Sequence, residues 1–86
     1  MKLAFTETKP ADPYTMAFRF VLRLIAGEYV THMETLAKDG AHDGFHHGHY
    51  HQANMSAAYE DLKARAAKES LRVLDAQGER IPLANL

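Results

Sequence analysis

A segment in the middle of the chain alternates between apolar and other side chains, and this alternation limits the possible folds more than any other feature. Apolar residues occupy every second position around Arg19 and Arg23: Met16, Phe18, Phe20, Leu22 and Leu24. A period of two is typical of a β-strand with one buried face. After Gly27, the sequence EYVTH adds aromatic and β-branched side chains, which favour strands. The pattern therefore predicts two strands, residues 16–25 and 28–36, joined by a hairpin turn near Gly27.

A single long helix over residues 14–37 is the competing interpretation. Asp12 and Pro13 suit the cap and the first turn of a helix. A helical face can also be drawn through seven apolar residues: Phe18, Val21, Leu22, Ile25, Tyr29, Met33 and Leu36. Such a helix would place Gly27 in its interior and leave four apolar residues on its polar side: Met16, Phe20, Leu24 and Val30. Because the strand pair leaves fewer apolar side chains without a buried face, we favour the hairpin.

The clearest helix signal lies in residues 54–69. The segment is rich in Ala, Leu, Glu, Lys and Arg, which are good helix formers. Asn54 or Ser56 can cap its first turn. Residues at spacings of four, three and four form one apolar stripe: Met55, Tyr59, Leu62 and Ala66. This stripe predicts a helix whose apolar side packs on the sheet.

Two further strands are expected from shorter signals. Residues 44–51 predict a third strand, because Gly44 and Gly48 would each destabilise a helix by about 1 kcal/mol relative to alanine. The N-terminal sequence KLAFTET can add an edge strand in which Leu3 and Phe5 face inward.

The C-terminal segment, residues 71–83, has two possible structures. It can form a hairpin in which Asp75 opens a type I turn and Gly78 takes the left-handed conformation. Alternatively, the helix continues to Ala76 and stops before Gly78. With either ending, residues 1–86 form one small α+β domain. The expected architecture is an antiparallel sheet of three to four strands with one main helix packed on one face.

Charge balance and the absence of cysteine restrict the possible functions. The chain of 86 residues has 10 Lys and Arg, 11 Asp and Glu, no Cys and a net charge of −1 with neutral histidines. Nucleic-acid binders usually carry a clear basic excess, so we do not expect a nucleic-acid partner. Disulfides and Cys-based zinc sites are excluded, and the lack of cysteine fits a cytoplasmic protein. Its apolar runs are too short for a signal peptide or a membrane span, so no membrane partner is expected.

The sequence GFHHGHYHQ, residues 44–52, places four histidines within nine positions. On a regular strand, His47, His49 and His51 would point to the same face. His32 on the neighbouring strand could add another imidazole, and such a set suits zinc, nickel or copper. The sequence does not identify a carboxylate ligand to complete the site. We therefore favour a strand whose histidines serve a surface or an interface, without an obligatory metal or other cofactor, and keep the transition-metal site as the alternative.

Catalysis is not expected for this chain. The only serines, Ser56 and Ser70, lie outside any Gly-x-Ser-x-Gly context, and a chain of this length has little room for a deep pocket. A small sheet with one helix leaves a face and two edges open, which favours binding to another protein and self-association as a homodimer. The residue types that often carry interface energy include Tyr and Arg. The expected interaction residues are Arg19, Arg23, His46 and Tyr50.

Residues 28–65 contain a pattern of three short motifs. The matching residues are Tyr29, Val30, Thr31 and His32, then Gly48, His49 and Tyr50, then Asp61, Leu62 and Arg65. This pattern resembles one in small uncharacterised bacterial and phage proteins, although His47 stands where that pattern has a large aromatic residue. The resemblance implies a sheet-plus-helix fold and a phage or mobile-element protein that binds a host protein. In size and lack of motifs the chain is similar to anti-CRISPR proteins.

Overall fold

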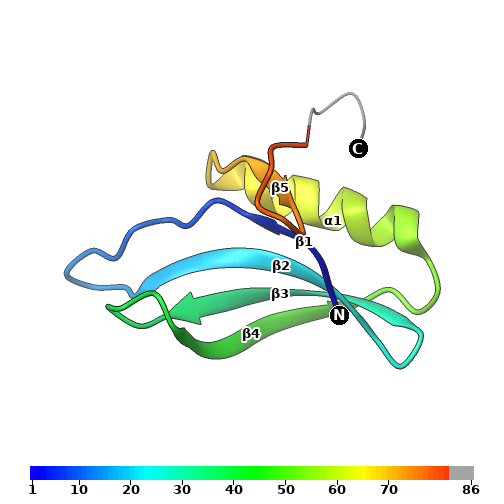
Figure 1. Ribbon diagram of the computed structural model, residues 1–86, viewed down its shortest axis with the longest axis horizontal. Helices are drawn as coiled ribbons and strands as arrows, with labels where there is room; N and C mark the ends of the chain where they lie inside the picture. The colour runs from blue at the N-terminus through cyan, green and yellow to red at the C-terminus, as the bar shows by residue number, and fades with distance from the viewer. Residues whose placement is uncertain (82–86) are drawn as a thin grey trace.

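The computed structural model describes residues 1–81 and shows a five-stranded antiparallel sheet with one helix packed on one face (Figure 1). The spatial order of the strands is β4-β3-β2-β1-β5, which confirms the expected α+β fold. No helix of the described residues is long and apolar enough to cross a membrane. The elements in chain order are β1 (Lys2–Thr6), β2 (Ala17–Ile25), β3 (Glu28–Leu36), β4 (His42–Tyr50), α1 (Met55–Lys68) and β5 (Val73–Asp75).

The β2–β3 hairpin is confirmed, and the long helix over residues 14–37 is wrong. The two strands pair without interruption from Ala17 opposite Leu36 to Ile25 opposite Glu28. The two turn residues between them both have positive φ: Ala26 (50°) and Gly27 (80°). Positive φ at both central residues is the geometry of the tight hairpin turn that matches the twist of the flanking strands. The alternating pattern predicted the structure better than the helical one, because in a strand it places the apolar side chains on one buried face.

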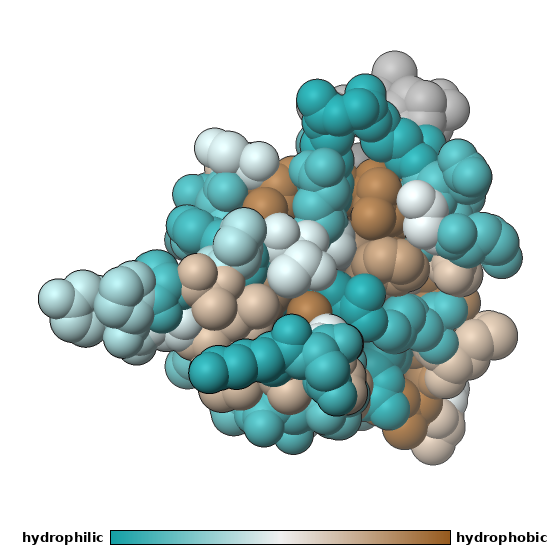
Figure 2. Space-filling model, turned by 60° about the vertical axis from the view of Figure 1, so that its left-hand side comes forward, coloured by the Kyte–Doolittle hydropathy of each residue, from teal (hydrophilic) through white to brown (hydrophobic). Residues whose placement is uncertain are grey.

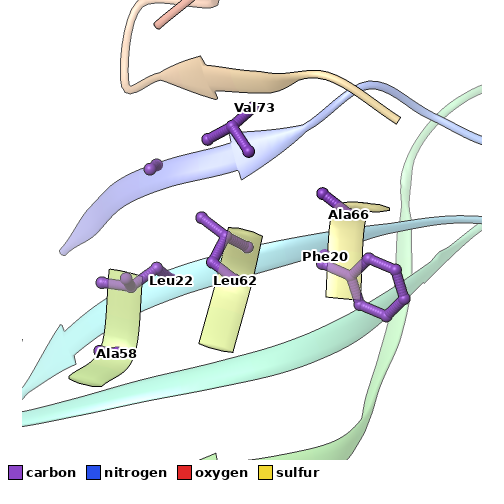
Figure 3. Packing of buried hydrophobic residues seen from close by; sticks show 7 residues of the cluster. Phe20, Leu22, Ala58, Leu62, Ala66 and Val73 are labelled. Atoms are coloured by element: carbon purple, nitrogen blue, oxygen red, sulfur yellow. The ribbon is translucent and has the colours of Figure 1, made fainter. Parts of the chain in front are cut away.

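The core lies between α1 and the sheet (Figure 3). Leu62 lies at the centre of the helix and is fully buried. Met55, expected in the apolar stripe, is instead half exposed. The buried residues of α1 are Ala58, Leu62 and Ala66, and the line through them passes beside Met55. Asn54 caps the helix, its side chain accepting a hydrogen bond from the Ala57 amide. The buried apolar residues of this cluster are Ala4, Phe20, Leu22, Ala58, Leu62, Ala66 and Val73.

Strand β1 corrects one expectation, because Phe5 faces away from the helix. The register of β1 against β2 shifts between Lys2 and Ala4. This irregularity leaves Ala4 opposite Leu22 in the core, while Phe5 pairs with Val21 on the other side of the sheet. Leu3, in the irregular stretch, still packs against the core, as expected. One extra residue in a strand reverses the alternation beyond it, and the sequence pattern did not reveal that residue.

The C-terminal hairpin is confirmed within the described residues, and the continuation of the helix to Ala76 is wrong. Helix α1 ends at Lys68, and Ser70 has a φ of 56°. Strand β5 then pairs with β1, which gives the sheet its fifth strand. Asp75 accepts hydrogen bonds from two amides of the turn, and Gly78 takes the left-handed conformation with a φ of 85°. Residues 82 and 83 of the expected hairpin lie outside the described residues.

Candidate functional site

The sheet face opposite α1 carries a cluster of cationic, aromatic and histidine side chains. In Figure 1 no helix or strand of the described residues covers this face. Even so, Val21 is fully buried and Val30 is 2% exposed. Long side chains lying along the sheet provide the cover that a second layer would otherwise give. We call these side chains the open-face cluster: Lys2, Phe5, Arg19, Arg23, His32, Glu34, His42, Phe45 and Tyr50.

Cation–π contacts hold the arginines of the open-face cluster flat on the sheet. The guanidinium of Arg19 lies 4.7 Å from the ring centroid of Phe5. That of Arg23 lies 4.4 Å from the ring centroid of Phe45. Both arginines follow the predicted alternation and so project to the face that α1 leaves uncovered. Such contacts contribute about 0.5–1 kcal/mol each at exposed sites.

A buried carboxylate lies at the centre of the open-face cluster. Glu34 accepts a hydrogen bond from Nε of Arg19 at 2.6 Å and one from Nδ1 of His42 at 2.7 Å. Its side chain is 4% exposed. Burial disfavours the ionised carboxylate, but the hydrogen bonds from Arg19 and His42 outweigh burial, so the pKa of Glu34 lies below its usual value. Glu34 is therefore ionised and acts as an acceptor that positions both donors.

His32 is a packing residue of the open face. Its ring lies 5.2 Å from that of Phe45 and 6.0 Å from that of Tyr50, between ring centroids. The Nδ1 atom is buried without a hydrogen-bond partner among the described residues. Burial, followed by the nearby charge of Arg23, lowers the pKa of His32. A Cβ atom on Gly48 would lie 2.7 Å from Nε2 of His32, so the glycine makes room for the ring.

The charges of the open-face cluster differ from those of the rest of the chain. With neutral histidines, Lys2, Arg19 and Arg23 outweigh Glu34 and give the cluster a net charge of +2, whereas the whole chain carries −1. The remainder of the chain therefore carries −3. Burial and then the positive charge of Arg19 lower the pKa of Lys2. Glu28 lies on the same face at the β2–β3 turn, outside the cluster.

A second group of polar residues lies on the helix side, between β4 and α1. Asp61 of α1 accepts a hydrogen bond from the hydroxyl of Thr31. The same carboxylate oxygen lies 2.8 Å from Nδ1 of His49 and 3.2 Å from Nε2 of His51. Burial opposes ionisation of Asp61, but hydrogen bonds from Thr31 and both histidines outweigh it and lower its pKa. Because an ionised carboxylate only accepts hydrogen bonds, both histidine rings donate to it.

A bulge in β4 brings Arg65 of α1 onto the strand. The pairing of β4 with β3 shifts between Thr31 and Met33, opposite the dipeptide His47–Gly48, and His47 has a φ of 52°. Arg65 donates from Nη2 to the carbonyl of His47 at 2.6 Å and from Nη1 to the hydroxyl of Thr31 at 3.3 Å. The bulge therefore fixes the guanidinium beside the histidines of β4.

The structure brings three of the four expected interaction residues together. Arg19, Arg23 and Tyr50 lie on the open face. His46 lies on the opposite face, opposite Met33 in the ladder, and its Nε2 is 3.1 Å from the Thr35 hydroxyl. A bulge at His47–Gly48 follows His46, so the side chains of His46 and Tyr50 point to opposite faces of the sheet.

The histidines considered as metal ligands are divided between the two faces of the sheet. His32 lies on the open face, whereas His49 and His51 contact Asp61 on the helix side. His47 sits in the bulge, so the regular alternation expected of the strand does not hold. Within residues 1–81, no group of three or more His, Cys, Asp or Glu side chains is arranged to hold a metal ion.

Sequence reasoning missed Glu34, Phe5, Phe45 and the contacts of Asp61. One signal was available for Glu34, because it is an acidic residue in the interior of the strand predicted at 28–36, whereas Glu28 lies at the end of that strand. The contacts of Asp61 depend on where β4 lies relative to α1, for which the sequence has no local signal.

Comparison with family models, with curated proteins and with solved structures finds no match to this chain.

Proposed function

We propose that this chain is a non-enzymatic binding protein whose open-face cluster docks on an acidic surface of a partner protein. The observation that carries the proposal is the +2 charge of this cluster in a chain of net charge −1. Arg23 has no ion-pair partner within residues 1–81, and neither does Lys2. Complementary charge guides two surfaces together and disfavours partners of the wrong sign.

The surface suits polar docking better than a large hydrophobic interface. The face drawn in Figure 2 carries many hydrophilic residues, with hydrophobic residues between them at several places. The exposed large apolar residues are scattered over several elements: Met1, Tyr14, Met16, Ile25, Tyr50 and Met55. Of these, Tyr50 belongs to the open-face cluster and is 65% exposed. Arg and Tyr are enriched among residues that dominate binding energy, so Arg23 and Tyr50 are the expected anchors.

The covered rings of Phe5 and Phe45 favour a protein partner over a single-stranded nucleic acid. Bases bind such sheets by stacking on exposed aromatic faces. Here Arg19 covers Phe5 and Arg23 covers Phe45. The resemblance noted for residues 28–65 implies a host protein as the partner of a phage or mobile-element inhibitor, such as an anti-CRISPR protein. The chemistry proposed for the open face requires that its partner be acidic.

The proposal is tested with polyglutamate as the probe, titrated at low ionic strength and followed by calorimetry. Arg23→Gln and Lys2→Gln remove one charge each from the cluster, and Lys63→Gln removes one charge from α1 on the opposite side of the sheet. We expect each cluster variant to lose about threefold to tenfold in affinity, corresponding to roughly 0.6–1.4 kcal/mol. We expect Lys63→Gln to bind nearly as tightly as the wild type.

Equal losses in all three variants would show that polyglutamate responds only to overall charge and would overturn the proposal. A single-stranded oligonucleotide of equal charge is the second probe. If the oligonucleotide binds the open face more tightly than polyglutamate does, the partner is a nucleic acid and not a protein.

A further inference from the structure

The groove between β4 and α1 contains two carboxylates that already have hydrogen-bond or ion-pair partners. It has a volume of about 400 Å³, and Phe20 contributes to its lining. Asp61 at one side accepts hydrogen bonds at a single oxygen from Thr31 and two histidines. Glu69 at the other end forms an ion pair with Lys9 at 2.6 Å. Neither carboxylate is left without a donor.

The basic groups that line the same groove have unused donors. A guanidinium has five N–H groups, and the two hydrogen bonds of Arg65 to Thr31 and His47 leave three of them free. Lys68 also lines the groove and has no ion-pair partner within residues 1–81. The ring of His49 lines it as well, and its Nε2 atom has no hydrogen bond within the described residues because Nδ1 is the atom that contacts Asp61.

Arg65 is held in place before any ligand binds. The carbonyl that it contacts belongs to His47, a residue other than glycine with a φ of 52°. A positive φ is uncommon for such a residue and costs free energy. The guanidinium also lies 5.1 Å from the ring centroid of Phe20, which limits its movement on the other side. A fixed donor loses little conformational entropy when a ligand binds.

From these contacts we propose that the groove binds the phosphate group of a small organic phosphate monoester. Arg65 and Lys68 offer separate donors for the terminal oxygens of a phosphate, and Nε2 of His49 adds a third donor when the ring is protonated, because Nδ1 already donates to Asp61. A carboxylate offers only two oxygens to the same donors. The volume fits a small molecule and is too small for a folded partner. This site lies on the helix side and does not depend on the proposed function of the open face.

The test is a titration of the full chain with phenyl phosphate, followed by amide chemical shifts in ¹H–¹⁵N spectra. Benzoate and sodium sulfate at equal ionic strength are the comparison ligands. We expect saturable shifts at residues 47–49 and 61–68, with a dissociation constant on the order of 1 mM, as for a small ligand that makes a few charged contacts. Benzoate should bind at least about fivefold more weakly, a difference near 1 kcal/mol, whereas sulfate, which also presents three or more oxygens, should compete for the same site.

Two variants and one matched control locate the site. Lys68→Gln should weaken phenyl phosphate binding about threefold or more, which corresponds to at least roughly 0.6 kcal/mol. Arg65→Lys keeps the charge but removes the planar guanidinium, and it should weaken binding more than Lys68→Gln does. Lys63→Gln removes a charge from a part of α1 that does not line the groove, and binding should remain unchanged. Unchanged spectra away from the substitution confirm that each variant is folded.

The proposal is overturned by any of three results. Shifts that stay linear up to tens of millimolar show that no site exists. Benzoate affinity equal to that of phenyl phosphate shows a general anion effect. Equal losses in the Lys68→Gln and Lys63→Gln variants place binding outside the groove.

Discussion

Replacing Glu34 by glutamine removes the one negative charge of the open-face cluster without changing the size of the side chain. Wild-type Glu34 accepts hydrogen bonds from Arg19 and His42 while its side chain is 4% exposed. Arg19 always donates, so the amide oxygen of the glutamine must face it. The amide NH₂ group then faces Nδ1 of His42, which must give up its proton to accept a hydrogen bond. The His42 contact becomes a hydrogen bond between neutral groups, and the Arg19 contact loses the charge of its acceptor.

The size of the effect follows from these two contacts. A hydrogen bond to a charged group contributes about 1.5–3 kcal/mol, against roughly 0.5–1.5 kcal/mol for a neutral one. We therefore expect Glu34→Gln to lower the free energy of unfolding by about 2 kcal/mol at pH 7. In a domain of this size, that loss lowers the Tm by roughly 8–16 °C. Glu28→Gln is the matched control, because Glu28 lies at the end of the same strand without a side-chain hydrogen bond within the described residues, and its effect should stay within about 0.5 kcal/mol.

The pH dependence gives a second readout for Glu34. Its pKa in the folded protein lies below its usual value, so its ionised form stabilises the fold at all pH values above the unfolded pKa. This contribution is lost as the pH falls through the folded pKa. Urea unfolding of wild type and Glu34→Gln should give a difference that persists from pH 7 to about pH 5 and shrinks below about pH 4. A difference under about 0.5 kcal/mol at pH 7, or one that does not shrink below about pH 4, would refute this account of the buried carboxylate.

Other substitutions test packing and local geometry, each by urea unfolding. Leu62→Ala should cost about 3–5 kcal/mol, because the side chain is fully buried at the centre of the core. Asn54→Ala should cost about 1 kcal/mol by removing the helix cap. Gly48→Ala should cost roughly 1–3 kcal/mol, since its Cβ would meet the packed ring of His32, and adding His32→Ala should recover part of that loss. Dialysis of untagged protein against a chelator should leave the Tm unchanged, whereas one tightly held ion per chain by elemental analysis would contradict the expected metal-free fold. The expected homodimer stays a prediction, and sedimentation at micromolar concentration showing only monomer would contradict it.

The elements with local signals were the ones that sequence reasoning predicted. Residues 16–25 carry an alternation that only a strand can bury, and Gly27 permits the tight turn after them. The helix was predicted from composition and a capping Asn54. Each of these signals lies within a few neighbouring residues, so no knowledge of the tertiary arrangement was required.

The candidate sites were predictable only where strands stay regular. Arg19 and Arg23 were placed together correctly because β2 and β3 pair without a bulge. Phe5 does not face inward as expected, and His46 does not lie with the other expected interaction residues, because β1 and β4 each contain an irregularity. A bulge depends on cross-strand packing and has no strong sequence signal, yet it reverses the facing of every residue beyond it.

The bulge at His47 links several features of the molecule that would otherwise be unrelated. It places Gly48 next to His32, where only a glycine leaves space for the ring. It also turns the His47 carbonyl toward Arg65. That carbonyl is therefore occupied and less available to an added strand, so the exposed edge of β4 is a poor site for strand-to-strand association. The partner binding proposed for the open face and the anion binding proposed for the groove therefore do not use the hydrogen-bonding edge of β4.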